Sequence, residues 1–556
     1  MHRLSYHEEN SEDTEALLHP PDVPKPHRHS RHVRNRSHVN QAIALLCSGS
    51  RRRVLLKILT ALTSLLFIFV VLAAIFRPWA TILPRQTPND TNTSLPPRYT
   101  AIRKHTASLP QHNISLPPPE GHNGRYIKFT SQISQLGWNN VLNEVLLNAH
   151  LAYRAKRAYV FGDYDWKKEY FPWPENVRFE DPPRTPLGAL LGGPVVGDPW
   201  VGLNESEVRE HPRSVNIDFW EVVCPPNRRR VIKTSDVKPW HKLNTYDKSG
   251  SETLELWLKL LTDPAFFLAT SSVPNLEVDE DDWSCVEILP APREEDSFPQ
   301  VFDLWLWGCE RILDLWDEFK ASPISSLGLR TGSVVLRGVE RNMGLFTRHR
   351  RTHEVRRARE EDPMERTLAI HIRRGDFVQA CQDLADWNST YYSWNQLPFL
   401  PDHFVPPPYP PDKERGTNNN SPENVATYLG HCLPDDDAIA RKVEQARLDW
   451  EAATNRTPTA GHFLDTIFLL TNERDPVWLG KLKSHFMDAG GWKNVVVSSL
   501  EVVYGDAQEL DVGMAVDMEL ARRAAVFVGN GFSSFTSNIL HRRLVDEKIP
   551  ISNRFF

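Results

Sequence analysis

A run of 19 residues without a charged side chain, residues 58–76 (ILTALTSLLFIFVVLAAIF), constrains this 556-residue chain more than any other feature. As a helix it spans about 28 Å, which is close to the thickness of a bilayer's hydrocarbon core. A buried core helix would show a polar face, and a signal peptide would lie at the extreme N-terminus with a small-residue cleavage site. Because 57 residues precede the run, we expect residues 54–76 to form a transmembrane signal-anchor.

Basic residues around this segment predict its orientation. The 20 residues on its N-terminal side carry four, and the 20 on its C-terminal side carry two. This excess puts the N-terminus in the cytosol and the rest of the chain in a lumen. The Asn-X-Ser/Thr sugar-acceptor sites beyond the segment agree with a luminal body: Asn89, Asn92, Asn113, Asn204, Asn388, Asn419 and Asn455.

The flanking composition predicts the remaining layout. Residues 1–53 form a disordered cytosolic tail, and residues 77–122, with nine prolines, form an extended luminal stem. This layout is typical of a single-pass type II enzyme of the Golgi or endoplasmic reticulum, although a tethered receptor could share it. The five luminal cysteines allow at most two disulfides, and the net charge of −6 argues against a nucleic-acid partner.

Strands alternate with helices through the rest of the chain. Apolar runs such as AYVF and TIFLLT are typical of strands, and LGWNNVLNEVLLNAHLAYR has helical spacing. Such alternation predicts parallel sheets. We therefore expect an α/β fold with two Rossmann-like domains facing a cleft, an N-terminal one over residues 123–362 and a C-terminal nucleotide-sugar-binding one over residues 363–556.

Three loops hold candidate site residues, and the first is LGWNN. Gly137 permits a tight turn there, and Asn139 and Asn140 lie at the start of a helix. Free backbone amides and the helix dipole favour an anion at such a position. The simpler alternative is that asparagine serves as an N-cap.

The second loop, HIRRGDF, follows an apolar strand. Side chains alternate along a strand, so His371 and Arg373 share one face. Such a pair suits a diphosphate, because a guanidinium grips two phosphate oxygens at once. Arg374 follows, and Asp376 can orient an arginine or accept from a hydroxyl. The alternative is a structural Arg–Asp pair.

The third loop, FVGNGFSSFTSN, combines glycines with serines. Gly529 and Gly531 allow a close approach of backbone, and Ser533, Ser534 and the following amides can cradle a phosphate. No lysine follows the glycines, so the loop is not a Walker A sequence. A serine N-cap after a glycine turn is the alternative interpretation.

Together, GWNN…NEVLLNAHLAYRAKR, HIRRGDF and FVGNGFSSFTSNILHRR resemble the GDP-fucose protein O-fucosyltransferase family in order and spacing. The segment TNERD and Asp517 also fit, and the resemblance covers roughly residues 121–556. It implies a two-domain glycosyltransferase of the GT-B type that inverts the anomeric carbon without a metal or other cofactor. Its partners would be GDP-fucose as donor and a protein or glycan acceptor.

The resemblance also implies roles for individual residues. The family's asparagine, histidine and arginine that contact GDP-fucose correspond to Asn140, His371 and Arg373. Its nucleotide-binding aspartate and Ser-Ser-Phe positions correspond to Asp517, Ser533, Ser534 and Phe535. A guanidinium fixed where the leaving diphosphate gains charge binds the transition state better than the ground state, so Arg373 is our candidate catalytic residue, assisted by His371.

One departure and two alternatives remain. Some family members carry a glutamate base before the first-loop glycine, where this chain has Leu136. Asp163 and Asp165 form an Asp-x-Asp pair after a strand, which is the manganese-binding pattern of another glycosyltransferase class. A non-catalytic protein that binds nucleotide sugars or glycans is the other alternative, since a fold does not fix a function.

Overall fold

The computed structural model describes residues 95–130, 136–174, 177, 182–238, 248–263, 265–266, 283–292, 300–326, 329–347, 362–374, 377–456, 462–488 and 490–556. All of them belong to one compact unit that takes in Thr91–Phe556. The predicted tail, the signal-anchor at 54–76 and the first part of the stem lie outside the described residues. Among the helices within these ranges, none is both long and apolar enough for a membrane crossing.

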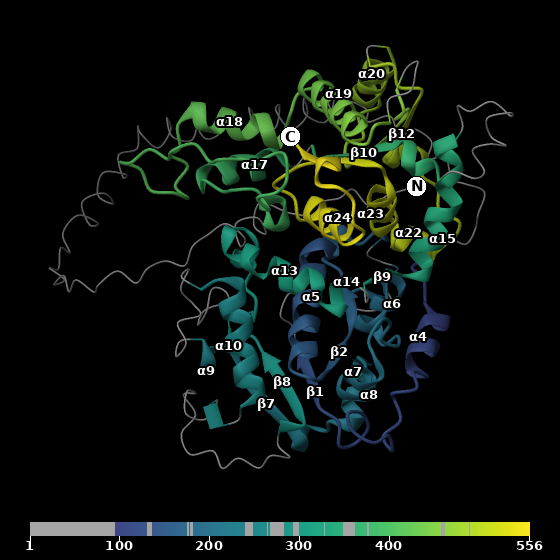
Figure 1. Ribbon diagram of the computed structural model, residues 1–556, viewed down its shortest axis with the longest axis vertical. Helices are drawn as coiled ribbons and strands as arrows, with labels where there is room; N and C mark the ends of the chain where they lie inside the picture. Colours follow the sequence, from purple (N-terminus) through teal and green to yellow (C-terminus); the bar gives the residue numbers. More distant parts are fainter. Residues whose placement is uncertain are drawn as a thin grey trace, which may run out of the picture. The chain divides into compact units, whose positions relative to one another are not determined.

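The first large sheet has five parallel strands in the order β6-β2-β1-β8-β7. Its strands are β1 (Tyr126–Phe129), β2 (Ala158–Phe161), β6 (Val215–Asn216), β7 (Arg229–Lys233) and β8 (Cys285–Leu289). Figure 1 shows α5 (Trp138–Arg154) and α10 (Gly250–Thr262) near these strands. Helix α10 begins with a capping box in which Ser249 and Glu252 satisfy each other's backbone amides.

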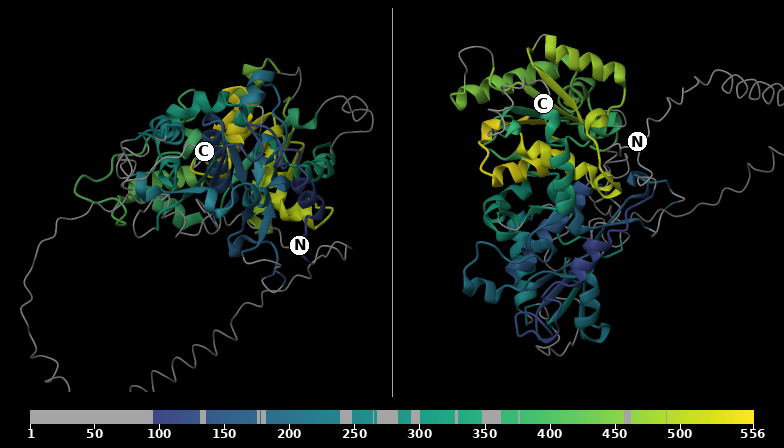
Figure 2. Two further views of the ribbon diagram at one scale, coloured as in Figure 1. Left: turned by 90° about the horizontal axis from the view of Figure 1, so that it is seen from below. Right: turned by 90° about the vertical axis from the view of Figure 1, so that its right-hand side faces the viewer.

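The second large sheet also has five parallel strands, in the order β12-β11-β10-β13-β14. Its strands are β10 (Thr367–Ile372), β11 (Thr466–Thr471), β12 (Asn494–Val497), β13 (Val526–Gly529) and β14 (Asn553–Phe555). In the right-hand view of Figure 2 the C-terminus, which follows β14, lies among the green and yellow segments. The prediction of an α/β fold with parallel sheets is confirmed.

Two short antiparallel pairs complete the strands, β3 (Asp163–Asp165) with β4 (Arg184–Pro186) and β5 (Leu191–Gly192) with β9 (Arg330–Thr331). The remaining described helices of the first part of the chain are α4 (Thr100–Ala107), α6 (Leu187–Leu190), α7 (Glu205–Glu210), α8 (Ile217–Val223), α9 (Thr234–Val237), α12 (Leu304–Trp307), α13 (Trp316–Ala321), α14 (Pro323–Ser326) and α15 (Ser333–Asn342). Those of the second part are α17 (Phe377–Asp386), α18 (Pro422–Cys432), α19 (Asp436–Ala453), α20 (Pro476–Asp488), α21 (Ser498–Glu501), α22 (Ala507–Asp511), α23 (Gly513–Arg523) and α24 (Ser534–Val545).

Residues 95–122 differ from the predicted extended stem, because they belong to the folded body. Helix α4 follows Tyr99, a buried residue whose hydroxyl donates to Asp511 Oδ2 at 2.7 Å. Gln111 is also buried, and its amide donates to the carbonyl oxygens of Gly197 and Ser214. Tyr99 and Gln111 therefore fix this stretch to the folded body, so it is not a free tether.

Helix α15 packs with the second part of the chain, although its sequence precedes the predicted boundary at residue 362. A Cβ added at Gly338 would meet Val516 Cγ2 at 2.7 Å, so α15 and α23 are in close contact. Arg341 Nε donates to Glu509 at 2.8 Å, and Asn342 exchanges hydrogen bonds with the backbone of Val503. The elements that surround the second sheet therefore begin near residue 333.

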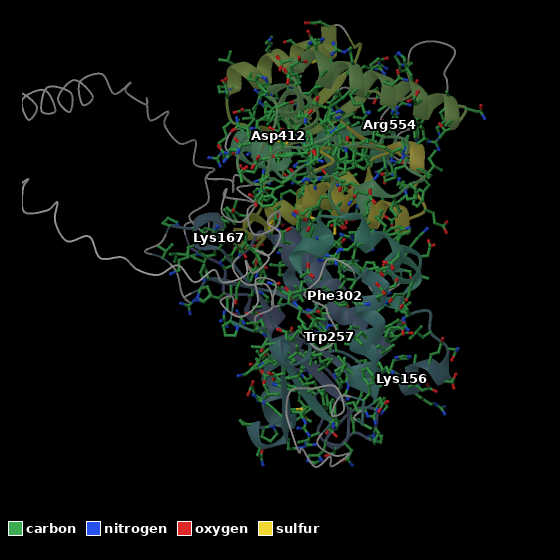
Figure 3. The ribbon with its side chains drawn as sticks, turned by 90° about the vertical axis from the view of Figure 1, so that its left-hand side faces the viewer. Lys156, Lys167, Trp257, Phe302, Asp412 and Arg554 are labelled. Carbon is green, nitrogen blue, oxygen red and sulfur yellow. A yellow bond between two sulfur atoms is a disulfide. The ribbon has the colours of Figure 1, made fainter. Side chains whose placement is uncertain are left out.

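Two disulfides join Cys224 to Cys285 and Cys381 to Cys432, and Cys309, the remaining described cysteine, is not disulfide-bonded. This result agrees with the prediction of at most two luminal bridges. The largest hydrophobic core cluster contains residues from both parts of the chain. Figure 3 labels two of its buried members, Trp257 and Phe302.

Candidate functional site

The second sheet has a topological switch point between β10 and β13. From the central strand β10, the chain adds β11 and β12 on one side and then β13 and β14 on the other. Ligands of open parallel sheets bind outside the carboxyl ends of the strands at such a point. The second loop follows β10 and the third follows β13, and the pairing of Ile370 with Val528 brings both loops to one edge.

Side chains alternate between the two faces of the sheet along β10, which ends at Ile372, before Arg373. Leu368, Ile370 and Ile372 belong to one core cluster, whereas Ala369 belongs to another. All six residues of the strand are buried, because helices cover both faces of this parallel sheet. His371 therefore lies on the face of Ala369, opposite the isoleucines.

His371 is held by the first turns of α24. Its Nδ1 lies 3.0 Å from Thr536 Oγ1, and its ring centroid lies 4.6 Å from that of Phe535. Burial, with a smaller effect of the neighbouring Arg373 charge, lowers the pKa of His371 to about 3. The imidazole is therefore neutral near pH 7, and it can donate or accept a hydrogen bond but does not neutralise an anion.

Arg373 follows the end of β10 and is buried, with 2% of its surface exposed. Its guanidinium carbon lies 4.2 Å from the centroid of the Phe377 ring at the start of α17. This cation–π contact restricts the guanidinium. Its charge adds to the effect of burial in lowering the pKa of His371.

Arg374 has different surroundings from Arg373. Its guanidinium lies 4.3 Å from the Trp478 ring and 3.6 Å from Glu473 Oε2. Its backbone N–H and C=O both bond the Asn472 side chain. The TNERD segment thus supports Arg374, which indicates a structural role. Asp376, the fourth candidate of this loop, lies outside the described residues.

The two glycines of the third loop are required by protein contacts. A Cβ at Gly529 would clash with Thr536, and one at Gly531 would clash with the Tyr391 ring. Ser533 is the N-cap of α24, and its Oγ accepts from the Phe535 amide at 3.2 Å. Ser533 therefore acts as an N-cap, as the alternative interpretation of this loop expects.

Two hydroxyls in the first turn of α24 are buried without a hydrogen-bond partner among the described residues. They are Ser534 Oγ and Ser537 Oγ. Burying a hydroxyl without a partner is unfavourable. Because both belong to the start of a helix of 12 residues at the switch point, they are suited to receive an oxygen-rich ligand.

The first loop joins the other two through hydrogen bonds. Asn538 of α24 donates to the Asn139 carbonyl at 3.0 Å. Tyr392 donates its backbone N–H to Gly531, and its hydroxyl contacts the side chains of Asn140 and Asn143. Asn139 and Asn140 are both buried, so the three loops converge around α24.

Some features of the first loop differ from expectation. The N-cap of α5 is Gly137, with φ −58° and ψ 144°, rather than an asparagine. Leu136 is buried, and its carbonyl oxygen accepts from the Tyr164 hydroxyl.

Asp517 is fully buried on α23, which packs against α24.

Sequence reasoning missed the residues that connect the loops, Tyr392, Thr536 and Asn538. Thr536 and Asn538 lie in the third loop motif, FVGNGFSSFTSN. Their positions on the helix that follows the serines could have indicated that they lie near the site. Tyr392 had no such signal, because it lies in an unremarked segment whose contact with Asn140 spans 252 residues of sequence.

The Asp-x-Asp pair lies at the first sheet, not at this edge. Asp163 Oδ2 is 2.9 Å from Arg103, and Asp165 Oδ1 is 3.0 Å from Arg184. A cation there would have to displace both guanidinium groups. Across the described ranges, no group of three histidine, cysteine or acidic side chains is arranged to hold a metal ion.

These features define an α/β protein with two parallel sheets, in which His371, Arg373 and the buried serines of α24 lie at the switch point of the second sheet. No family model matches the chain, and no curated protein matches it. Solved structures that resemble it include fucosyltransferases.

One such structure is POFUT1 in complex with GDP-fucose, with 12% identity, a TM-score of 0.38 and coverage of 75% of this chain and 94% of that chain. NodZ from Bradyrhizobium has 12% identity and a TM-score of 0.30, covering 76% and 93%. A mutant of Arabidopsis thaliana FUT1 in complex with GDP has 12% identity and a TM-score of 0.29, covering 80% and 74%.

Proposed function

We propose that the chain is a glycosyltransferase that transfers fucose from GDP-fucose to a hydroxyl of a protein or glycan acceptor, with inversion at the anomeric carbon. The observation that carries this proposal is the convergence of the three loops at the switch point between β10 and β13. A buried arginine, a neutral histidine and helix-start serines there suit a nucleoside diphosphate.

Arg373 has the central role in this proposal. As the fucose–phosphate bond breaks, the bonding electrons pass to the β-phosphate oxygen, and a fixed guanidinium stabilises the charge that develops there. His371 holds the same group by a hydrogen bond, and Ser534 binds the nucleotide phosphates. Asp517, Phe535 and the first-loop asparagines complete the donor site.

No divalent metal or other cofactor is required in this proposal. The cationic charge that a diphosphate needs comes from arginine, and the Asp163 and Asp165 carboxylates are paired with other guanidinium groups. The proposal assigns no base to the acceptor hydroxyl, because Leu136 stands where some O-fucosyltransferases carry a glutamate.

The experiment that tests the function measures GDP release from GDP-fucose by the purified full-length protein, with and without candidate acceptors. Release of GDP with formation of a fucosylated product is the expected result. Tight GDP binding without any release, with every acceptor tried, would instead support a nucleotide-sugar-binding protein without activity.

We also propose a single-pass type II membrane location in the Golgi or endoplasmic reticulum, with the body luminal. The apolar segment at residues 54–76 and the excess of basic residues before it support this topology. Protease added to sealed microsomes should remove only the short tail, and glycosidase should increase the mobility of the remainder on a gel. Release of a large cytosolic fragment would contradict the topology.

A further inference from the structure

A cavity of about 550 Å³ lies at the carboxyl ends of β1, β2 and β6 in the first sheet. Cavities of ~300–1,000 Å³ are typical of small-molecule sites. The antiparallel pair of β3 and β4, helices α4 and α6, the start of α8 and one face of α5 contribute the remaining walls. Like the candidate donor site on the second sheet, the cavity lies at the carboxyl ends of parallel strands. None of the donor-site residues lines it.

The charged groups of this cavity are mixed in sign. Four carboxylates line it, from Glu144, Asp163, Asp165 and Asp218, together with the cations of Arg103, Lys128 and Arg184. The pairs of Arg103 with Asp163 and of Arg184 with Asp165 are partly exposed, with side-chain exposures of 24–45%. Hydrogen-bond acceptors and donors therefore stand side by side on the wall.

This mixture selects against two kinds of ligand. A phosphate group would be repelled by the carboxylates, which outnumber the cations. A metal ion would have to break ion pairs of Asp163 and Asp165 at 2.9 and 3.0 Å. A hydroxyl group fits best, because it donates to a carboxylate and accepts from a guanidinium at the same time.

A second, independent observation comes from Asn148, which lines the cavity and is only 2% exposed. Its Nδ2 donates to Glu144 Oε1 at 3.2 Å, whereas its Oδ1 is buried with no donor within the described part of the chain. A ligand hydroxyl would supply that donor. Phe129 and Tyr159, whose ring centroids lie 6.2 Å apart, add apolar wall for the C–H faces of a sugar ring.

Helix α5 connects this cavity with the candidate donor site. Val141, Glu144, Val145 and Asn148 recur at helical spacing on the cavity side. Asn140, four residues before Glu144, contacts the Tyr392 hydroxyl next to the third loop. Val141 directly follows Asn140, and Glu144 lies about 6 Å further along the helix axis, so the cavity wall begins within one turn of that contact.

We propose that this cavity binds a saccharide, and that a glycan is the acceptor presented to the donor site. The role of the saccharide as an acceptor rests on the proposed function, whereas saccharide binding itself does not. The cavity takes one or two sugar units, which a glycan end supplies. A protein acceptor without sugars is the alternative that the test addresses.

The test uses saturation-transfer NMR of the full-length protein with the methyl glycosides of galactose, glucose, mannose, xylose and N-acetylglucosamine. At least one glycoside should receive saturation. A Gly162→Trp variant should abolish that signal, because Gly162 lines the cavity and a Cβ added there meets no atom within 4 Å. Calorimetry should show unchanged GDP binding by this variant.

Two further variants give graded outcomes. Asp165→Asn should weaken glycoside binding about tenfold, as expected when a charged hydrogen-bond acceptor is lost. Glu205→Gln, on the exposed helix α7 outside the cavity, should leave binding unchanged. If Gly162→Trp does not fold, the saccharide site is tested by comparing glycoside binding of Asp165→Asn with that of Glu205→Gln.

Failure of this inference is distinguishable from failure of the proposed function. Absence of glycoside signal at millimolar concentration, while GDP still binds, overturns the saccharide site alone, and so does a signal that survives Gly162→Trp. Fucosylation of a sugar-free protein with no effect of Gly162→Trp also overturns it. Glycoside binding without GDP-fucose turnover overturns the transferase and leaves the saccharide site standing.

Discussion

Arg373 and Arg374 are adjacent in the chain but have different surroundings, and this difference predicts different effects of their removal. Arg373→Ala should reduce GDP-fucose turnover about a hundred- to a thousand-fold, as does the loss of one preorganised donor to a developing negative charge. Arg373→Lys should restore little, because an ammonium cannot copy a bidentate guanidinium. Turnover and the GDP affinity of the full-length protein are the measurements.

Arg374→Ala is the matched control for that change. It removes the contacts with Trp478 and Glu473, so the melting temperature should fall while turnover per folded molecule stays near that of the parent. Loss of turnover in Arg374→Ala together with its retention in Arg373→Ala would mean that the two roles are reversed.

The adjacent serines at the start of α24 should also respond differently. Ser534→Ala removes a buried hydroxyl that has no partner in the described part of the protein, so stability should not fall. If the hydroxyl binds the donor, GDP affinity should drop about fivefold to tenfold, equivalent to ~1 kcal/mol for one hydrogen bond. Calorimetric titration with GDP and urea denaturation measure the two quantities.

Ser533→Ala should instead destabilise the protein by ~1 kcal/mol, the usual cost of losing an N-cap. The reason is that Ser533 Oγ accepts from the Phe535 amide. Equal effects of the two substitutions on stability, with no effect of Ser534→Ala on GDP affinity, would remove Ser534 from the donor site.

At the scale of elements, β3 carries both aspartates of the Asp-x-Asp pair. The metal-dependent alternative can therefore be tested there. EDTA should change the rate of acceptor-independent GDP release less than about twofold, because the proposed chemistry takes its positive charge from arginine. Asp163→Ala should be similarly mild in this assay, since its ion pair with Arg103 is partly exposed and worth ~1 kcal/mol at most. Loss of activity with EDTA and its recovery with manganese would favour the Asp-x-Asp mechanism.

Local sequence predicts some of these elements well. The apolar run of β10 is long enough to identify a buried strand, and the alternation of Ile370, His371 and Ile372 identifies its two faces. The polar residues directly after β10 and β13 indicate a site, because the carboxyl ends of parallel strands meet at one edge.

Other features could not be predicted because they depend on contacts between distant segments. Tyr99 looks like part of a Pro-rich stem, yet its hydroxyl binds Asp511, 412 residues away. Thr185 and Trp173 bind the same carboxylate. The neutral state of His371 has the same origin, since its burial by α24 is a tertiary property.

At the scale of the whole molecule, buried histidines predict a sensitivity to acid. Burial, reinforced by neighbouring arginines, lowers the pKa of His150, His371 and His541 to about 3, whereas an unfolded histidine titrates near 6.5. Between these values the unfolded chain binds protons that the folded chain does not. The free energy of unfolding should therefore fall as the pH falls below about 6.5, by up to ~1.4 kcal/mol per pH unit for each residue.

The window between about pH 5 and 6.5 separates this effect from the protonation of Glu519. Burial raises the pKa of Glu519, but Arg542 and Arg522 outweigh it and lower the pKa to about 2, so the stability that Glu519 contributes is lost only below about pH 4.5. Urea denaturation at several pH values in this window should show a smaller slope for His541→Gln than for the parent. His403→Gln, at an exposed position, is the control and should keep the parent's slope. A slope that is the same for both variants and the parent would mean that His541 is protonated in the folded chain, and that its contact with Ser325 at 2.6 Å does not depend on a neutral ring.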